Sequence, residues 1–405
     1  MRKAGCFFNF ICFIIYIRKR INYFTYKYRC SVKFLTIDMR QRLHAIKNRF
    51  SELKAFLKRY ERWLMPVTLF TGFVADYITF VSIQVNTALW LLFAYWILAG
   101  LIVLFTYAYD FGKVSLKFRY LRLFAPLITQ FLFGGLLSNS FIFYWFSGSL
   151  YSSWPFILLF VFLMVGNEAL RHWFFKPVVQ LGVYFFGTIS FASVALPFLF
   201  NSVEPKYFVF GSLASLVAFF FYLFLLFWLL PQTRRLVPSL FLSAILIAAV
   251  MNLFYFKNLI PPVPLALRES GIYHNLKRLG GSYVLSAEKE NFFSKIWPGQ
   301  TAHFSPGGRL YVFTAIFAPK NLNAPIFHHW QYYDQKKGEW VEKDVLSFTL
   351  TGGRKEGFRG YSYKTVVAEG KWRVLVKTSR GQTLGVVKFA VLQAVGQVEL
   401  NEIVK

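Results

Sequence analysis

Cysteine and acidic residues are both scarce in this chain, and each scarcity excludes a class of protein. Only three of the 405 residues are cysteines, all within the first 30, so no disulfide framework is expected in the rest of the chain. Charged residues make up 16% of the sequence, and only 18 are acidic against 46 that are basic. Soluble domains carry about 25% charged residues. The composition therefore excludes an ordinary soluble domain.

Catalytic motifs are also missing. The chain contains no His-Glu-x-x-His metal motif, no Gly-x-Ser-x-Gly nucleophile motif and no Gly-x-x-x-x-Gly-Lys phosphate loop. It also lacks a repeated pair of hydrophobic half-helices broken by glycine or proline, the pattern of many transporters. We therefore assign no catalytic residue and expect no cofactor.

What the sequence does contain is long hydrophobic runs. Hydrophobic residues make up 56% of the chain and include 50 phenylalanines. A run of about 20 such residues can cross the hydrocarbon of a bilayer, where only a helix satisfies its own backbone hydrogen bonds. The sequence predicts an α-helical membrane bundle of about seven transmembrane helices within residues 63–257. The predicted spans are 63–80, 89–109, 123–146, 154–175, 178–200, 207–230 and 237–256.

Basic residues are distributed unevenly around these runs. The first 63 residues hold 16 Lys or Arg and three acidic residues, and the second, fourth and sixth breaks hold most of the other basic loop residues. Basic flanks stay on the cytoplasmic side. We therefore predict a multi-pass protein of the plasma (inner) membrane with a cytoplasmic N-terminus and a periplasmic or extracellular C-terminal domain. Anionic lipid is the nearest polyanion, so we expect contact with the lipid bilayer and no nucleic-acid binding.

Two segments precede the first predicted span. Residues 1–38 contain a short apolar patch followed at once by basic residues, which fits neither a span nor a signal peptide. Translation from Met39 is the alternative, which would make residues 1–38 an over-extended reading frame. Residues 39–62 repeat apolar residues at helical spacing among basic ones, which predicts a basic amphipathic helix lying in the membrane interface. A short coiled coil is the competing interpretation.

Ionisable residues inside the spans are the candidates for intramembrane chemistry, because a charge in lipid is costly. Asp76 lies within the first span and has no basic neighbour in the sequence. Glu168 lies near the inner end of the fourth span, with Arg171 and His172 following at helical spacing, so an ion pair accounts for it. For Asp76 a structural role and a role in chemistry both stay open.

After residue 257 the sequence changes to short alternating segments. Residues 258–280 are predicted to be a linker that leads to an all-β immunoglobulin-like sandwich over residues 281–405. Trp330 and Trp372 lie in the middle of two of the strands. The predicted strands are 309–318, 326–333, 339–351, 358–367, 371–378 and 383–392, with a weaker one at 282–288.

Two groups of side chains in this region are candidates for binding. His303, His328 and His329 invite a metal site, but neighbouring residues of a strand point to opposite faces, so only one of the last two can join His303, and we assign no metal. A basic and aromatic stretch is the candidate for an anionic envelope glycan or a lipid headgroup, with a solvated strand as the alternative. Its members are Arg354, Lys355, Arg359, Tyr361, Tyr363 and Lys364.

Several motifs resemble a known bacterial family. They include PPVPL at 261–265, SGIYHNL at 270–276, HHWQYY at 328–333, FRGYSYK at 358–364, GKWRVLV at 370–376 and GQTLGVVKFAV at 381–391. This set is similar to the domain of unknown function 2914, which follows a multi-span membrane region, and GFVAD at 72–76 resembles the membrane part of that family. The resemblance implies an extracytoplasmic sandwich and supplies no activity.

These observations favour a non-enzymatic protein of the bacterial cell envelope. The helices would anchor and sense, and the sandwich would bind a ligand or another membrane protein. The alternative is a membrane transporter or a membrane-embedded enzyme that uses Asp76. A water-filled cavity reaching Asp76 would favour the alternative, and a tight apolar bundle would favour anchoring.

Overall fold

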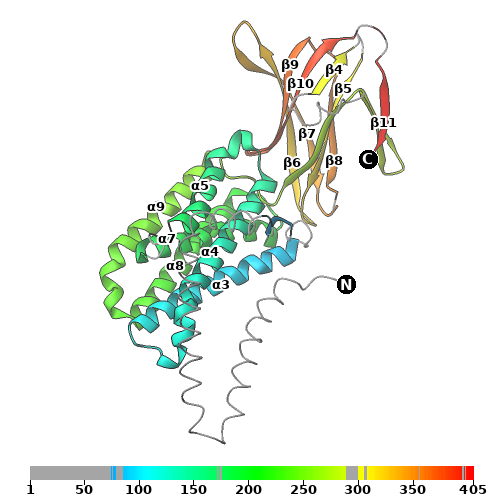
Figure 1. The fold of residues 1–405 in the computed structure, drawn as a ribbon. Coiled ribbons are helices and arrows are strands. Elements are labelled where there is room, and N and C mark those ends of the chain that lie inside the picture. The colour runs from blue at the N-terminus through cyan, green and yellow to red at the C-terminus, as the bar shows by residue number, and fades with distance from the viewer. Residues whose placement is uncertain are drawn as a thin grey trace, which may run out of the picture. The chain divides into compact units, whose positions relative to one another are not determined.

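The computed structural model describes residues 74, 76–78, 85–170, 173, 176–288, 300–304, 308–354, 356–394, 396 and 398–405. Along the chain a helical part is followed by a β-rich part (Figure 1). The segments expected at residues 1–38 and 39–62 lie outside the described residues. Of the first expected span only residues 74 and 76–78 are described, and they are helical.

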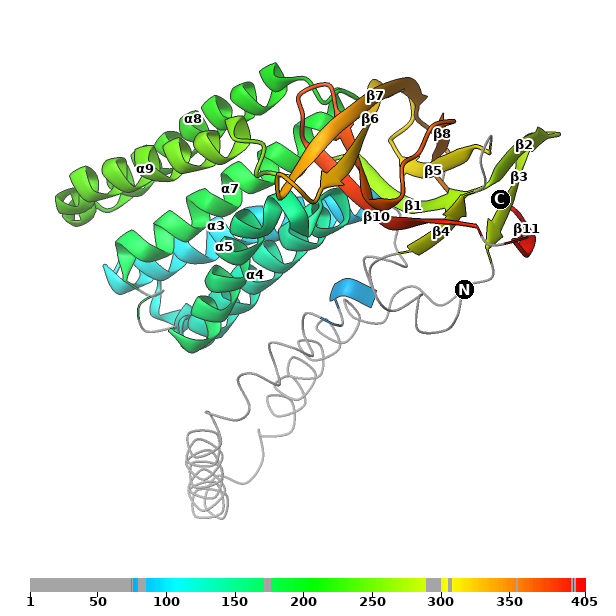
Figure 2. The ribbon, with the colours of Figure 1, turned by 90° about the horizontal axis from the view of Figure 1, so that it is seen from above.

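Six helices in the described part are long and apolar enough to cross a membrane. They coincide with the second to seventh expected spans, so a total of seven is not confirmed. Neighbouring helices contact one another and lie side by side (Figure 2). The six are α3 (Val85–Asp110), α4 (Arg119–Ser147), α5 (Leu150–Ala169), α7 (Pro177–Leu199), α8 (Pro205–Leu229) and α9 (Val237–Phe256), the last preceded by the 3-10 turn η2 (Pro231–Leu236).

Close packing and hydrogen bonds between helices hold this bundle together. In lipid the hydrophobic effect contributes little to the association of helices, so packing and hydrogen bonds between helices contribute more than they do in water. The indole of Trp96 on α3 donates to Thr188 on α7 at 2.9 Å, and the hydroxyl of Tyr107 donates to Gln180 at 2.8 Å. Large apolar side chains such as Phe221 on α8 point outward and are exposed in the protein alone, as lipid-facing residues are.

The β-rich part is a sandwich of two sheets with two clusters of buried apolar residues between them. Trp330 at its centre is fully buried and packs edge-on against Phe389, with the ring centroids 6.0 Å apart. Residues from both sheets surround this pair. One sheet has the order β1 (Ala266–Tyr273), β5 (Leu310–Phe317), β8 (Phe358–Lys364), and the other has the order β4 (Gln300–Phe304), β10 (Thr383–Gln393), β9 (Gly370–Thr378), β6 (Asn323–Asp334), β7 (Glu339–Thr351).

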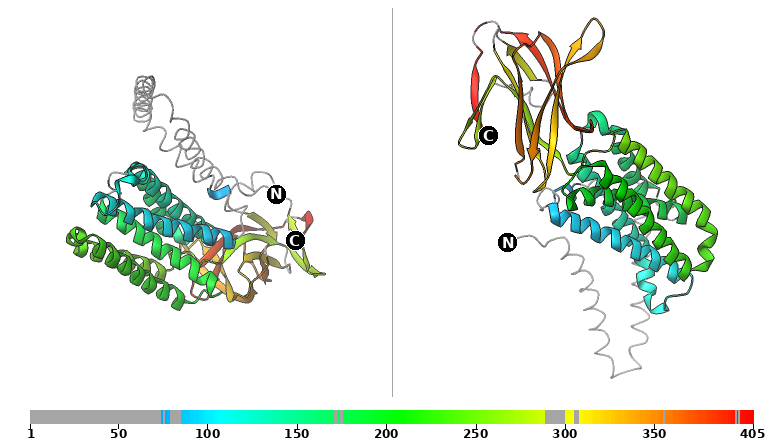
Figure 3. Two further views of the ribbon diagram at one scale, coloured as in Figure 1. Left: turned by 90° about the horizontal axis from the view of Figure 1, so that it is seen from below. Right: turned by 180° about the vertical axis from the view of Figure 1, so that it is seen from behind.

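This strand order follows the immunoglobulin plan, in which a buried tryptophan lies on a central strand. All seven expected strands are present, and β1, β2, β4 and β11 are additional. β2 (Asn275–Leu279), β3 (Ser282–Glu288) and β11 (Leu400–Val404) form a third, smaller sheet. Residues 266–273, expected within a linker, form β1 and pair with β5, because packing overrides the weak alternation of ALRESGIY. The third sheet is visible beside the sandwich in Figure 3.

Candidate functional site

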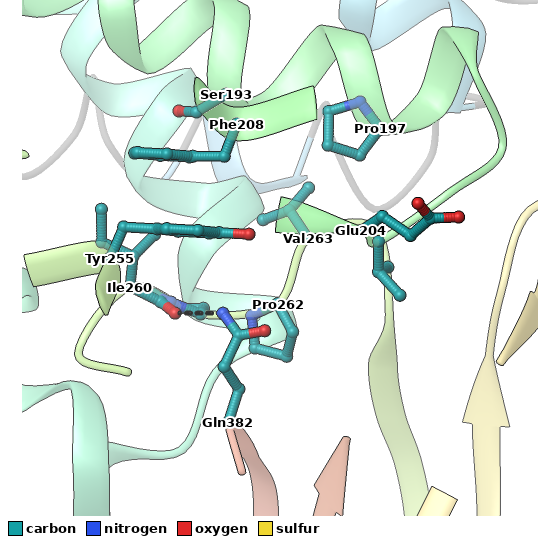
Figure 4. Close-up of a pocket in the computed structure, with 11 residues that line it drawn as sticks. Ser193, Pro197, Glu204, Phe208, Tyr255, Ile260, Pro262, Val263 and Gln382 are labelled. Atoms are coloured by element: carbon teal, nitrogen blue, oxygen red, sulfur yellow. Dashed lines mark hydrogen bonds between the residues drawn. The ribbon is translucent and has the colours of Figure 1, made fainter. Parts of the chain in front are cut away.

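The junction between α9 and the sandwich is closely packed. Asn258 donates to the carbonyl of Arg380 at 3.0 Å, and Gln382 donates to the carbonyl of Ile260 at 3.0 Å (Figure 4). A cavity of about 20 Å³ lies here, lined by residues that include Ser193, Glu204 and Tyr255. Such a space holds about one water molecule, so it is not a site for an organic ligand.

Three arginines of the sandwich contact aromatic residues at the near ends of three helices. The guanidinium of Arg380 lies 4.0 Å from the ring centroid of Tyr255 at the end of α9. Arg373 on β9 donates to the hydroxyl of Tyr151 near the start of α5 at 2.9 Å. Arg268 on β1 lies 6.0 Å from the ring of Phe146 at the end of α4. Cation–π contacts of this kind fix the sandwich to the helix ends.

The intramembrane candidates are only partly described. Asp76 is partly buried, and its carboxyl interacts with the hydroxyl of Ser138 on α4. That hydroxyl is buried and makes no hydrogen bond of standard geometry within the described residues. Asp76 does not line the cavity described above. Glu168 lies in the last turn of α5, whereas Arg171 and His172 lie outside the described residues, so their ion pair stays a prediction.

His328 belongs to a closed hydrogen-bond network in the sandwich core. Thr314 donates to the carbonyl of Gly360 at 3.3 Å, so its oxygen is free to accept from Nε2 of His328 at 3.2 Å. Ser362 accepts from the indole of Trp330 at 2.9 Å and can donate to Nδ1 of His328 at 2.8 Å. This arrangement fits the neutral imidazole. Burial, with a smaller effect of His329, lowers the pKa of His328 to about 4.

The other histidines in the described part of the chain are paired with carboxylates. His329 lies 2.7 Å from Glu342, while His303 and His274 each lie 2.7 Å from an oxygen of Glu288. Burial raises the pKa of Glu288, but the hydrogen bonds from the two histidines outweigh burial and leave the pKa below its ordinary value. Among the described residues, no group of three or more such side chains is placed to hold a metal ion.

The basic and aromatic stretch at 354–364 is divided between two faces of β8. Tyr361 and Tyr363 point outward and are 43% and 46% exposed. Arg359 shares their face, whereas Lys364 lies on the opposite face and forms an ion pair with Asp344 of β7. Arg354 is exposed in the preceding loop, and Lys355 lies outside the described residues. Three of the six expected residues therefore share one surface.

Neighbouring strands complete this surface. Tyr311 on β5 lies opposite Tyr363, with the two ring centroids 5.4 Å apart, and is itself buried against residues of β3. The guanidinium of Arg309 lies 5.5 Å from the ring of Tyr363. We call Arg309, Tyr311, Arg359, Tyr361 and Tyr363 the tyrosine face.

The third sheet contacts β1 and β5 and covers part of the tyrosine face. Tyr283 of β3 packs against Tyr361 with a centroid distance of 6.3 Å, and Arg359 donates to the carbonyl of Gly281 at the β2–β3 turn at 3.3 Å. Glu269, on the same side of β1, forms an ion pair with Lys405. The uncovered part of the face is therefore aromatic and basic.

Sequence reasoning missed Arg309, Tyr311 and Tyr283. Alternation within RLYVFTAIFA places Tyr311 and Phe313 on one side of a strand, and this pattern could have predicted an aromatic face on that strand. Which strand lies beside which, and in what register, cannot be derived from alternation, and only that pairing brings Tyr311 to Tyr363.

The fold and this surface define a class: a membrane protein with several helical spans and a C-terminal immunoglobulin-like sandwich that exposes an aromatic and basic face. The family model described as "Protein of unknown function (DUF2914)" matches residues 323–391, which run from β6 to β10. The C-terminal region therefore carries a DUF2914 domain, as the motifs predicted. No curated protein matches the chain.

Several solved structures show distant likeness. An immunoglobulin-like protein from Pseudomonas aeruginosa is 12% identical over 30% of this chain and 97% of its own length, with a TM-score of 0.19. A β-glucosidase from Listeria innocua is 14% identical over 32% of this chain and 16% of its own, with a TM-score of 0.18. The DNA glycosylase AlkC from Pseudomonas fluorescens is 12% identical over 69% and 83%, with a TM-score of 0.18. TM-scores this low carry no argument about fold or function.

Proposed function

We propose that the protein is a membrane-anchored binding protein of the bacterial envelope whose tyrosine face takes an anionic glycan outside the cytoplasm. The observation that carries this proposal is the exposure of Tyr361 and Tyr363 beside Arg309 and Arg359 on one side of the sandwich. A tyrosine ring offers a flat apolar surface and a hydroxyl, which together suit a sugar ring. The arginines supply charges that a carboxylated or sulfated sugar would complement.

The bundle supports an anchoring role. Hydrogen bonds such as Trp96 to Thr188 link its helices directly, and the cavity at the junction has room for about one water molecule. We propose that the N-terminus is cytoplasmic and the sandwich extracytoplasmic, on the basis of the basic flanks. A transport or catalytic role for Asp76 is the second candidate, favoured by the interaction of its carboxyl with the buried hydroxyl of Ser138 inside the bundle.

Binding of the purified full-length protein to a uronic-acid polysaccharide tests the proposal, with neutral dextran as the matched ligand. We expect binding to the anionic polymer that weakens as salt is added. The double change Tyr361→Ala and Tyr363→Ala should lower the affinity at least about tenfold, because stacking and exclusion of water are both lost. The double change Arg309→Gln and Arg359→Gln should lower the affinity and flatten its salt dependence.

The change Lys336→Gln and Lys337→Gln is the control, since it removes two charges from the exposed β6–β7 turn. Equal binding of dextran and the uronic-acid polymer, or binding that neither double variant alters, would refute the proposed ligand.

A further inference from the structure

The outward side of the five-stranded sheet carries a second basic surface, apart from the tyrosine face. On β9, Trp372, Val374 and Val376 point into the core and are buried, so the alternate residues Lys371, Arg373, Leu375 and Lys377 lie on the other side, where Leu375 is also covered. The register places Lys388 of β10 beside Arg373 on this outward side. We call Lys371, Arg373, Lys377 and Lys388 the basic face.

Two acidic residues near the basic face, Glu342 and Glu288, are engaged by histidines, whereas Glu369 before β9 is exposed. Glu342 of β7 lies on the same side, bonded to His329 and close to Lys377. Glu288, near the edge strand β4, is held by His303 and His274. Lys371 and Lys388 are exposed, and no ion pair of either is present in the described part of the chain. The basic face therefore keeps a net positive charge.

The position of the basic face follows from its contact with α5. Arg373 donates to Tyr151 at 2.9 Å, and α5 also contacts β10. Tyr151 and Trp154, in the first turns of α5, are 49% and 57% exposed and point away from the bundle. Tyrosine and tryptophan at the end of a span lie at the level of the lipid headgroups. Arg373 therefore lies at that level too, and its lysine neighbours lie beside the membrane surface.

We propose that the basic face binds anionic lipid headgroups of the leaflet on the sandwich side. Four cationic side chains on a rigid sheet, joined by Arg373 to an interfacial helix end, are complementary to such a surface. The basic face and the tyrosine face belong to different sheets, so lipid contact leaves the tyrosine face free for its own ligand. The proposal rests on the membrane-spanning character of α5 and does not require that the tyrosine face binds a glycan.

Fluorescence quenching in nanodiscs tests this proposal on the full-length chain. Ala390 of β10 pairs with Lys371 of β9, so a fluorophore at position 390 would lie beside the basic face. It is attached to the variant Ala390→Cys, made after the three native cysteines are changed to Ser. The discs contain phosphatidylcholine alone or mixed with phosphatidylglycerol, and both carry a trace of lipid with a spin-labelled headgroup. We expect quenching to be at least about twofold stronger in the anionic discs, and to fall at high salt.

The triple change Lys371→Gln, Lys377→Gln and Lys388→Gln should remove the difference between the two kinds of disc. It keeps Arg373 and its contact with Tyr151. The matched control changes Lys320, Lys336 and Lys337 to Gln, which removes the same charge from exposed turns and should leave the difference intact. Circular dichroism confirms that each variant is folded. Equal quenching in both discs, or a difference that survives the triple change, overturns the proposal.

Discussion

The Nδ1 atom of His328 lies 2.8 Å from the hydroxyl of Ser362, which also accepts a hydrogen bond from Trp330. A histidine that invites a metal hypothesis in the sequence is thus a neutral, fully satisfied part of the sandwich core. His328 lies on β6 and its partners Thr314 and Ser362 lie on β5 and β8, so the network joins the two sheets.

This network makes the sandwich sensitive to acid. The ordinary pKa of histidine is 6.5, and burial lowers that of His328 to about 4. Above pH 6.5 both folded and unfolded chains hold the neutral imidazole, and the full stability is present. Between pH 6.5 and pH 4 the unfolded chain binds a proton that the folded chain does not, so the free energy of unfolding should fall by about 3 kcal/mol.

Denaturant unfolding followed by tryptophan fluorescence checks this fall in stability. The variant His328→Gln should be less stable at neutral pH and should lose most of the dependence between pH 6.5 and pH 4. The variant His329→Gln removes an imidazole near the surface and should keep that dependence. If the free energy of unfolding of His328→Gln depended on pH as that of the wild type does, the pH dependence would come from another titratable group.

The boundary of the β domain gives a second prediction. A fragment of residues 258–405 contains β1, whereas one of residues 281–405 lacks β1 and β2 and exposes the edge of β5. We expect the longer fragment to be soluble and to unfold cooperatively, and the shorter one to aggregate or melt without a transition. Circular dichroism during heating distinguishes them. A cooperative transition of similar midpoint in both would show that β1 is dispensable.

Orientation in the membrane can be decided by cysteine labelling. Suitable probe positions are exposed ones, such as Lys336 in the β6–β7 turn and Gln232 before α9. In a background without native cysteines, Lys336→Cys should react with an impermeant thiol reagent in intact spheroplasts, and Gln232→Cys should react only after lysis. The reverse pattern would place the sandwich in the cytoplasm.

Asp76 gives a fourth prediction. The variant Asp76→Asn keeps the size and hydrogen bonding beside Ser138 while removing the cost of a charge in lipid, so we expect a melting temperature in detergent equal to or above that of the wild type. Asp76→Leu should melt lower, because it leaves Ser138 without its polar neighbour. A melting temperature several degrees lower in Asp76→Asn would reveal a partner for the charge. A transport defect with unchanged stability would favour the second candidate function.

Composition and periodicity predicted six of the described helices and seven strands, because spans and alternating strands are dictated by local sequence. They did not predict β1, since ALRESGIY contains charged residues and glycine that become acceptable only against β5. Lys364 was grouped with Tyr363 because the two are adjacent in the sequence, although adjacency in a strand places them on opposite faces. Tyr311 and Arg309 join the tyrosine face through strand pairing, which no local pattern encodes.

The contacts of Arg268, Arg373 and Arg380 with α4, α5 and α9 have a mechanical consequence. The consecutive helices α4 and α5, and α9 further along the chain, are all contacted at one end by a single domain. At the opposite ends of the bundle, Arg122 at the start of α4 forms an ion pair with Asp110 at the end of α3, which links two helices directly and not through the sandwich. A load applied to the sandwich would therefore act on α4, α5 and α9 together, through the ends that the three arginines contact.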